Sequence, residues 1–185
     1  RSGGLASAAI RILPELSLLG ADPDRTWLEK VSQLSHGLVL ITGSSGSGKS
    51  TTMARILSLI SQKRACHVVT LEDPVEYVIP MEKALVHQRE IGRDVVDFPQ
   101  GIRDALREDP DVIALGEMRD SETISAALTA AETGHLVLGT LHTTRAKDVP
   151  ARIIHAFPGD RQEEIRGLLA ANLVTVSSQM LYRSG

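Results

Sequence analysis

A glycine-rich loop followed by a lysine and a hydroxyl residue lies in the first third of the chain. Residues 43–50 read G-x-x-x-x-G-K-S, inside the stretch LVLITGSSGSGKSTT. A strand before such a loop and a helix after it let successive backbone N–H groups point at one spot, where the helix N-terminus also favours an anion. Lys49 can reach the β- and γ-phosphates of a nucleotide, Ser50 can bind Mg²⁺, and Thr51 can touch the α-phosphate.

The alternative to a phosphate site is a plain serine-glycine connector. At average residue usage, the motif arises by chance in a chain of this length roughly once in a hundred cases. An apolar stretch before the loop and a helical pattern after it further reduce the probability of a chance match. The sequence therefore predicts a phosphate site formed by Gly43, Ser44, Ser45, Gly46, Ser47, Gly48, Lys49, Ser50 and Thr51.

Polar side chains follow three further apolar stretches. HVVTL leads into Glu72, Asp73 and Glu76, VIALG leads into Glu117, and HLVLGTL leads into His142. In an open α/β sheet, ligands bind at the carboxyl ends of the strands. Phosphoryl transfer to water needs carboxylates that hold a metal's water shell and orient the attacking water, and a donor beside the γ-phosphate. The convergence of these groups on one edge favours a catalytic role for Glu72, Glu117 and His142.

Each of these residues taken alone has a simpler interpretation. A carboxylate after a strand is commonly a solvated loop residue, and a lone histidine is more often structural, which we expect for His36, His67, His87 and His155. The second carboxylate also departs from the usual Walker B pattern, because Gly116 stands where an aspartate normally closes the strand. Asp111 begins that strand, so we place it at the far edge of the sheet and do not assign it to the metal.

The spacing of apolar residues predicts the elements that position these groups. Strands are expected at residues 38–42, 67–71, 111–116 and 135–141, which are apolar without alternation. Helices are expected at 49–62, from a cap at Asp97 to about Glu108, after Asp120 or Ser121, and after Asp160, whose spacing to Glu163 fits a capping box. A helical lead-in is expected at residues 8–34. Strands separated by helices predict an α/β fold with a mostly parallel sheet flanked by helices.

Length and composition restrict the class of protein. The chain has 185 residues and a net charge of -3, which fits one domain without a basic surface for nucleic acid. Cys66 is the only cysteine, so an internal disulfide is excluded and a reducing, cytoplasmic setting is expected. No apolar run has the roughly 20 residues that cross a bilayer. Because the first residue is Arg1, we expect a segment excised from a longer protein.

Two classes of nucleotide enzyme are disfavoured. The sequence has no N/T-K-x-D signature for guanine, which argues against a GTPase of the Ras kind. A small-molecule phosphotransferase would need a second substrate site with a lid, and no loop has an obvious lid composition.

Four blocks of the sequence resemble the secretion ATPases of type II secretion and type IV pili. They are the Walker A loop GSSGSGKSTT, the aspartate box TLEDPVEY, the atypical Walker B segment LREDPDVIALGEMRD and the histidine box TAAETGHLVLGTLHTT. Their order and spacing match the family, from about Ala8 to Leu181, and the family's Walker B segment also ends in Gly-Glu. The resemblance implies a RecA-like P-loop NTPase core that hydrolyses ATP with Mg²⁺.

The resemblance also assigns roles to single residues. Glu72 resembles the general base that orients the lytic water. Glu117 resembles the Walker B carboxylate, which acts on Mg²⁺ through water. His142 resembles the histidine-box residue that contacts the γ-phosphate, with His135 as its partner within that box. The remaining acids that match the aspartate box are Asp73 and Glu76.

The family resemblance implies an assembly larger than this chain. Members carry an amino-terminal PAS-like domain and a helical carboxyl-terminal part, so we expect residues 1–34 to be a linker and helical lead-in, and residues 35–185 to be the ATPase core. Members form homo-hexameric rings with ATP at subunit interfaces, and arginines reach in from the PAS-like domain; those arginines match no residue here. The ring would bind an inner-membrane platform protein from the cytoplasmic face, with only peripheral membrane association.

Within the family, VHQREIG, GEMRD and AAETGHLVLGTLHTT resemble the pilus-retraction ATPases most. A motor that drives pilus retraction, and hence twitching motility, is therefore expected. Two alternatives stay open: an ATPase for pilus extension or type II secretion, which often carries a four-cysteine zinc module, and a nucleotide-binding regulator with little turnover. A water-orienting base at Glu72 argues against the regulator.

Overall fold

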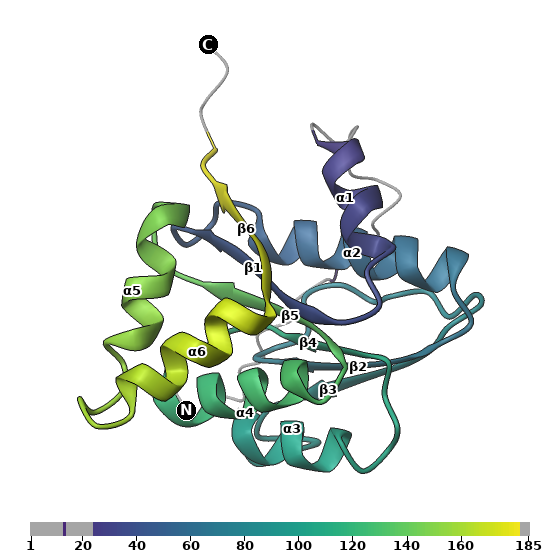
Figure 1. Ribbon diagram of the computed structural model, residues 1–185. Coiled ribbons are helices and arrows are strands. Elements are labelled where there is room, and N and C mark those ends of the chain that lie inside the picture. Colours follow the sequence, from purple (N-terminus) through teal and green to yellow (C-terminus); the bar gives the residue numbers. More distant parts are fainter. Residues whose placement is uncertain (1–12, 14–23, 182–185) are drawn as a thin grey trace, which may run out of the picture.

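The computed structural model describes residue 13 and residues 24–181, and its elements are shown in Figure 1. The helices are α1 (Arg25–Ser32), α2 (Lys49–Lys63), α3 (Phe98–Ala105), α4 (Ser121–Glu132), α5 (Val149–Ile154) and α6 (Gln162–Asn172), with a 3-10 turn, η2 (Ala146–Asp148), before α5. The strands are β1 (Gly37–Gly43), β2 (His67–Glu72), β3 (Leu85–Glu90), β4 (Val112–Leu115), β5 (Leu136–Leu141) and β6 (Leu173–Gln179).

These strands form one sheet in which all neighbouring pairs are parallel. Their order is β3-β2-β4-β5-β1-β6. Parallel neighbours require crossover connections, which helices supply for most of the pairs. Because every strand points the same way, all carboxyl ends lie along one edge of the sheet. The predicted α/β fold with a mostly parallel sheet is confirmed.

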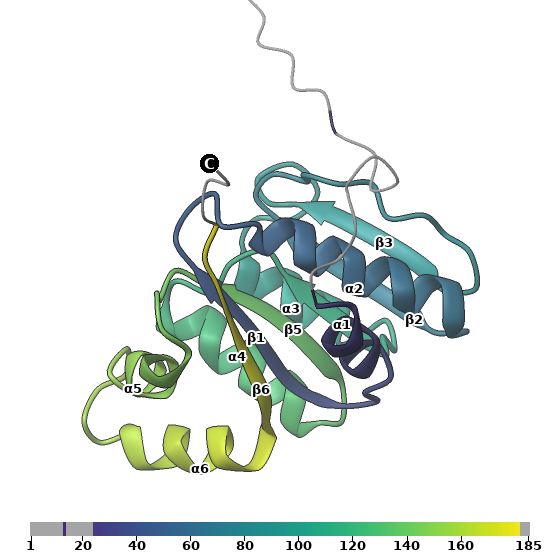
Figure 2. The ribbon, with the colours of Figure 1, turned by 90° about the horizontal axis from the view of Figure 1, so that it is seen from above.

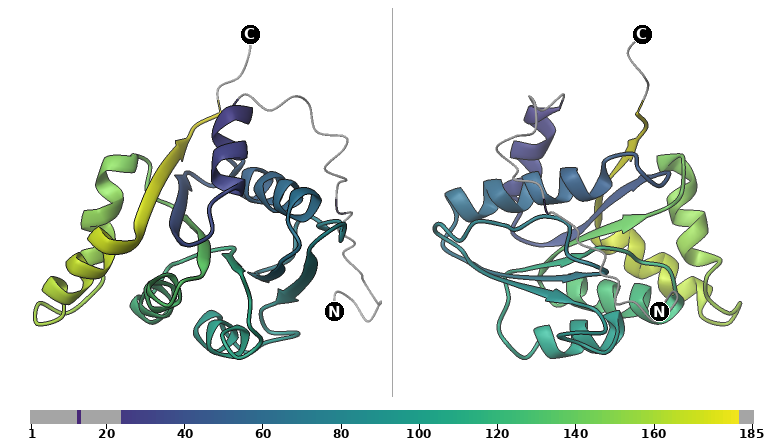
Figure 3. Two further views of the ribbon diagram at one scale, coloured as in Figure 1. Left: turned by 45° about the vertical axis from the view of Figure 1, so that its right-hand side comes forward. Right: turned by 180° about the vertical axis from the view of Figure 1, so that it is seen from behind.

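Helices cover both faces of the sheet, as Figures 1 and 3 show. α1 and α2 lie side by side on one face (Figure 2), where the side chains of Val39 and Ile41 pack. α3, α4, α5 and α6 lie on the other face, where Leu38 and Leu40 pack. None of these four side chains is exposed to solvent. An apolar run without alternation is therefore explained by a strand buried on both faces.

The four predicted strands are confirmed as β1, β2, β4 and β5, and they form the interior of the sheet. The sequence does not predict β3 and β6, which lie at the two edges. They read LVHQRE and LVTVSSQ, and most of their residues are only partly buried. An edge strand has one side open to solvent, so it lacks the continuous apolar run by which the interior strands were recognised.

Two of the three predicted helix caps are confirmed. Asp97 accepts a hydrogen bond from Gln100 N at 2.8 Å, and Asp120 accepts one from Thr123 N at 2.8 Å. The helix after Asp97 ends at Ala105 rather than near Glu108, since the chain turns before Pro110. A residue that precedes proline disfavours the helical region, and Asp109 has a φ of 53°.

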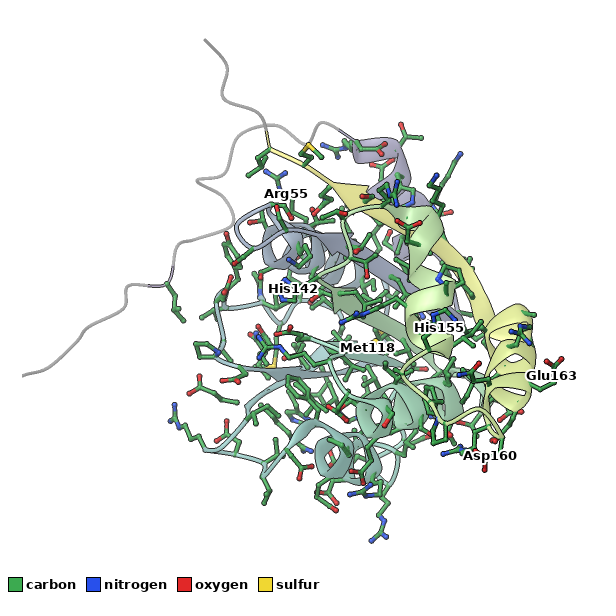
Figure 4. The ribbon with its side chains drawn as sticks, turned by 90° about the vertical axis from the view of Figure 1, so that its left-hand side faces the viewer. Arg55, Met118, His142, His155, Asp160 and Glu163 are labelled. Atoms are coloured by element: carbon green, nitrogen blue, oxygen red, sulfur yellow. The ribbon has the colours of Figure 1, made fainter. Side chains whose placement is uncertain are left out.

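The capping box predicted at Asp160 and Glu163 is wrong. Arg161 N bonds Pro158 O at 3.0 Å and closes a turn, so α6 begins at Gln162 and Arg161 takes the cap position without a side-chain bond. Glu163 instead pairs with Arg166. Figure 4 shows Asp160 and Glu163 at the surface near the start of α6, away from His142.

The helical lead-in predicted at residues 8–34 is described only in part. Within the described residues it contains α1, whose Leu28 and Val31 are buried against α2. The remainder of the predicted helix lies outside the described residues. In the part of the chain that the structure covers, none of the helices has the length and apolar character needed to cross a membrane.

Candidate nucleotide site

The glycine-rich loop makes a sharp bend between β1 and α2. Gly43, Gly46 and Gly48 have φ values of 151°, 73° and 90°, a range that glycine adopts readily and other residues avoid. Space also requires glycine at position 43, because a Cβ atom there would lie 2.5 Å from both Gln179 O and Ser47 Oγ. The first N–H groups of α2 follow the loop and have no partner within the helix. The loop therefore has the geometry of an anion site.

Lys49 begins α2 and folds back over the loop. Its Nζ donates to Gly43 O at 3.0 Å and to Ser44 O at 2.9 Å. Burial lowers the pKa of Lys49, while the charges of Glu117 and Glu76 act in the opposite direction. A buried ammonium group held only by neutral carbonyl oxygens gains a stronger partner when a phosphate oxygen is offered.

A cleft of about 630 Å³ opens at the carboxyl edge of the sheet. This volume is in the range of small-molecule and cofactor sites. Gly43, Ser44 and Ser47 belong to the loop but do not line the cleft. The other predicted loop and strand-end residues line it together: Ser45, Gly46, Gly48, Lys49, Ser50, Thr51, Glu72, Asp73, Glu76, Glu117 and His142.

Glu72 ends β2 and is held by two donors. Thr70 Oγ1 donates to Glu72 Oε1 at 2.6 Å, and Gln88 Nε2 donates to the same oxygen at 2.9 Å. Thr70 and Gln88 are direct partners in the β2–β3 register. The pairing of two strands thus fixes the orientation of the carboxylate, while Glu72 Oε2 takes part in neither bond.

Gln88 also connects Glu72 to the phosphate-binding helix. Its Nε2 donates to Tyr77 O at 2.9 Å, and its Oε1 accepts from Ile79 N at 2.7 Å. The hydroxyl of Tyr77 lies 2.8 Å from Thr51 Oγ1 at the start of α2. A continuous series of contacts therefore runs from Thr51 through Tyr77 and Gln88 to Glu72.

Glu117 follows β4 and contacts two basic side chains. His142 Nε2 lies 2.7 Å from Glu117 Oε1, and Arg119 Nε forms an ion pair with the same oxygen. The Glu117 side chain is 17% exposed, against 46% for His142 and 76% for Arg119. Oε1 itself is shielded from solvent. The carboxylate is therefore partly buried, and its two basic partners are more exposed than it is.

The close approach of β2 and β4 explains the atypical Walker B segment. Gly116 N donates to Leu71 O at 2.8 Å. A Cβ atom at Gly116 would lie 3.3 Å from Glu72 Cα and 3.3 Å from Leu71 O. This spacing disfavours the aspartate that usually closes the strand, so the carboxylate comes one residue later, as Glu117. Thr140 Oγ1 donates to Gly116 O at 2.5 Å and holds this turn against β5.

The loop that carries His142 is tied to β1 and β6. Thr42 Oγ1 donates to Thr143 O, and Ser178 Oγ donates to Thr144 O at 2.8 Å. The imidazole of His142 is left partly exposed beside Glu117 (Figure 4). The backbone of this loop is therefore fixed, while its side chain can still reach a ligand in the cleft.

His135 lies at the other end of β5. Its Nδ1 is 2.9 Å from Ala130 O and 3.1 Å from Thr133 Oγ1, at the C-terminal end of α4. The six residues of β5 span roughly 20 Å. Within one chain, the predicted pairing of His135 with His142 does not bring the two side chains together. Asp111 lies at the same far edge, as predicted, and accepts from His67 N at 2.8 Å.

The two further acids of the aspartate box lie at the wall of the cleft. Asp73 is exposed and precedes a cis peptide bond to Pro74. Glu76 is partly buried and near enough to Lys49 to act on its charge. The charge of Glu76 acts on Lys49, whereas that of Asp73 acts on Arg119.

Sequence reasoning missed three residues of this site: Thr70, Tyr77 and Gln88. Thr70 and Gln88 orient Glu72 from two adjacent strands. Gln88 lies on β3, the edge strand that was not predicted from the sequence. Its pairing with Thr70 therefore could not be predicted either. Tyr77 closes the block TLEDPVEY, and a polar aromatic residue so near Glu72 was the signal available for it.

The chain is similar to proteins of bacterial secretion and pilus systems. A family model described as "Type II/IV secretion system protein" matches residues 5–184. The uncharacterized protein YggR of Escherichia coli K12 is 50% identical over 179 residues, which are 95% of this chain and 54% of YggR. PilT of Pseudomonas aeruginosa, a type IV pilus retraction ATPase by name, is 50% identical over 155 residues, which are 84% of this chain and 45% of PilT.

The fold is also similar to a solved structure. A crystal structure of the pilus retraction motor PilT with bound ADP superimposes with a TM-score of 0.80 and 47% identity. The match covers 91% of this chain and 48% of that one, so the chain spans about half the length of these relatives. The likeness confirms the expected α/β fold and the family resemblance found in the sequence. The chain belongs to the type II/IV secretion system protein family.

Proposed function

We propose that this chain is the ATP-hydrolysing core of a type IV pilus motor and that the motor drives pilus retraction. The observation that carries the proposal is the cleft, where a phosphate loop, Lys49 and an oriented Glu72 face one space. Similarity to a named retraction ATPase supports the choice of machine. We further propose that residues 35–185 form the ATPase core and residues 1–34 lead into it from another domain.

The residues of the cleft fit a nucleoside triphosphate together with Mg²⁺. The free N–H groups at the start of α2 and the ammonium group of Lys49 are the donors that phosphate oxygens need. The hydroxyl of Ser50 and the shielded carboxylate oxygen of Glu117 are the hard oxygen ligands that suit Mg²⁺, Glu117 acting through water. Mg²⁺, when bound, neutralises charge on the β- and γ-phosphate oxygens.

Glu72 acts as the general base in this proposal. Hydrogen bonds from Thr70 and Gln88 fix Oε1, which leaves Oε2 to accept a proton from the attacking water. Gln88 also bonds Tyr77, and Tyr77 contacts Thr51. An α-phosphate bound at Thr51 would therefore contact the same series of side chains that orients Glu72. The base is thereby aligned by the elements that bind the substrate.

Charge that develops on the γ-phosphate is stabilised from two sides. Lys49 leaves the carbonyl oxygens of Gly43 and Ser44 and donates to the β- and γ-phosphates. His142 leaves Glu117 and contacts the γ-phosphate, which frees Glu117 for the metal's water shell. These exchanges replace contacts within the chain by contacts to the substrate, and those that strengthen as charge develops on the γ-phosphate favour hydrolysis.

The assembly proposed for this core is a homo-hexameric ring. Arg119 is the arginine that lines the cleft within the described residues, and it is mostly exposed. Further arginines would come from a neighbouring subunit, since an arginine finger contributes roughly a thousandfold or more in rate. We propose that the ring lies at the cytoplasmic face of the inner membrane and turns a platform protein embedded there.

The test is Mg-ATP turnover per chain over a range of protein concentrations, with Glu72→Gln measured in parallel. A specific rate that rises with concentration and is lost in the variant supports an assembling ATPase with Glu72 as its base. Bound ATP with no turnover at any concentration, including in a chain that carries the flanking domains, would instead indicate a nucleotide-binding regulator. Retraction is tested by deleting the gene and scoring twitching motility, and loss of pili would indicate extension.

A further inference from the structure

Two histidines and a glutamate come together outside the nucleotide site, at the amino end of the β2–β3 pair. Nitrogen atoms of His67 and His87 and a carboxylate oxygen of Glu108 all lie within 4.8 Å of one another. His67 begins β2, His87 lies on the edge strand β3, and Glu108 follows α3. Three separate segments thus contribute one potential ligand each, and none of the three residues is used by the proposed ATPase chemistry.

The spacing of the two imidazoles fits coordination of one ion. His67 Nε2 lies 3.0 Å from His87 Nδ1. Two nitrogens bound to one tetrahedral zinc ion at the usual distance are about 3.3 Å apart. The ring planes cross at 87°, with their centroids 5.0 Å apart. The separation of the two nitrogens is a few tenths of an ångström shorter than that between adjacent corners of a zinc tetrahedron.

The other nitrogen of His67 is held as metal-bound histidines usually are. His67 Nδ1 lies 3.1 Å from Glu108 O, which requires Nδ1 to carry the proton. The lone pair is then on Nε2 and accepts from His87 Nδ1–H, so zinc binding requires that proton to move to His87 Nε2. A histidine that ligates a metal almost always donates its second N–H to a carbonyl or carboxylate, which fixes the tautomer and the ring. The backbone hydrogen bond from His67 N to Asp111 adds a further restraint.

Glu108 provides an oxygen ligand with its position already defined. Both carboxylate oxygens accept from Arg89 Nη2 at 2.8 Å. Each oxygen keeps a second lone pair, so an ion can bind without loss of the arginine. Asp109 and Asp111 add negative charge nearby, while Arg107 and Arg89 offset it. The donor set of two imidazoles and one carboxylate is the kind that zinc accepts, with water at the fourth position.

We propose that His67, His87 and Glu108 bind one zinc ion. The ion links the edge strand β3 to β2 and to the segment after α3, at the end of the β2–β3 pair remote from Glu72. Gln88, which orients Glu72, follows His87 directly in the chain. Metal binding at this position therefore restrains the strand on which the orientation of the base depends.

The test is a titration of the nucleotide-free protein with Zn²⁺ against a chromogenic chelator. One ion per chain is expected, and Co²⁺ bound at the same place should give the visible absorption of a tetrahedral site. His87 is exposed, so His87→Asn should leave the fold intact, and circular dichroism checks this. We expect this variant to bind zinc at least about a hundredfold more weakly, and Glu108→Gln about tenfold more weakly.

Two matched variants separate this site from other zinc ligands. Cys66→Ser removes the only thiol of the chain, next to His67, and His155→Asn removes another exposed histidine. Both should bind zinc as the unmodified chain does. In addition, zinc should raise the Tm of the unmodified protein but not that of His87→Asn. Absence of binding at micromolar zinc, or an affinity that His87→Asn leaves unchanged, overturns the proposal and reduces the cluster to a hydrogen-bonded histidine pair.

Discussion

At the carboxyl edge of the sheet, Glu72 and His142 face a cleft and contact side chains from other elements. At the amino edge, Asp111 accepts from His67 N, and the shortest contact of His135 Nδ1 is with the backbone oxygen of Ala130. The residue types are the same at both edges, but their partners differ. A side chain that bonds to the backbone mainly stabilises the local structure. Side-chain partners can be exchanged, and so these groups remain available to a substrate.

The contrast between the two edges leads to different expected effects on stability and on activity. The amino-edge bonds close turns and strand ends, so their loss should lower the free energy of unfolding. The carboxyl-edge bonds orient groups around the cleft, so their loss should alter turnover or nucleotide affinity at nearly constant stability. The predictions below test the groups at the two edges.

The largest effect is expected from Glu72→Gln. Loss of a general base lowers turnover by about 10²- to 10⁴-fold, while nucleotide affinity should change little because Glu72 does not contact the loop. Steady-state ATPase rates and titration with a fluorescent nucleotide measure the two quantities. The amino-edge counterpart is Asp111→Asn, which should leave turnover within about twofold. Equal losses in both variants would remove the distinction between the edges.

Substitution of Lys49 by methionine should weaken ATP binding. A charge-assisted hydrogen bond contributes about 1.5–3 kcal/mol, so the Kd should rise roughly ten- to a hundredfold. Because the ammonium group is buried against two carbonyl oxygens, the variant also leaves those acceptors unpaired, and a small drop in Tm is expected. Unchanged affinity, measured by calorimetric titration, would contradict the assignment of Lys49 to the phosphates.

Nucleotide affinity should fall at alkaline pH. Burial lowers the pKa of Lys49, so this ammonium group loses its proton at a lower pH than an ordinary lysine does. Phosphate binds the protonated form, and the Kd for ATP therefore rises with pH above the lowered pKa, by at most about tenfold per pH unit. Lys49→Arg stays charged throughout and should flatten the curve. Titrations between about pH 7 and pH 10 at constant ionic strength compare the two proteins.

A smaller loss is expected from Gln88→Leu. The variant removes the donor to Glu72 Oε1 and the link to Tyr77, so turnover should fall about tenfold with the Kd for ATP unchanged. Tyr77→Phe keeps Gln88 in place and breaks only the contact with Thr51, and its effect should be a few-fold at most. A Gln88→Leu protein that turns over normally would show that Thr70 alone orients the base.

The smallest effect on activity is expected at His135. His135→Gln removes the contacts with Ala130 and Thr133 at the C-terminal end of α4, and should cost about 1 kcal/mol of stability. Turnover should stay within about twofold in a single chain. Chemical denaturation and ATPase assays measure both. A loss of turnover comparable to that of His142→Gln would place His135 in the chemistry, through a neighbouring subunit.

The interior of the fold was predictable, and the edges were not. Residues 38–41 are buried on both faces, so their sequence alone marks a central strand. β3 has a more mixed sequence, because an edge strand need not be apolar. The helix caps at Asp97 and Asp120 followed from residue type, but the cap expected at Asp160 failed because a turn at Pro158 moved the helix start.

The residues of the candidate site were predictable where they directly follow a strand. The loop, Glu72, Glu117 and His142 each follow an apolar run, and a parallel sheet brings such ends together. The supporting residues Thr70 and Gln88 depend on strand register, which spacing along the chain does not reveal. The family resemblance placed His135 in one box with His142, although β5 separates the two side chains.

The strand order has a consequence for synthesis of the protein. β1 pairs with β5 and β6, and β5 is the nearer of the two in the sequence. Leu136, opposite Gly37, comes about 100 residues later in the chain. At typical translation rates, that interval lasts roughly 5 to 20 s. β2 pairs with both β3 and β4, and these three strands can assemble on the ribosome during this time. The strand that carries the phosphate loop must wait, apolar and unpaired, until β5 emerges and joins it to the finished half-sheet.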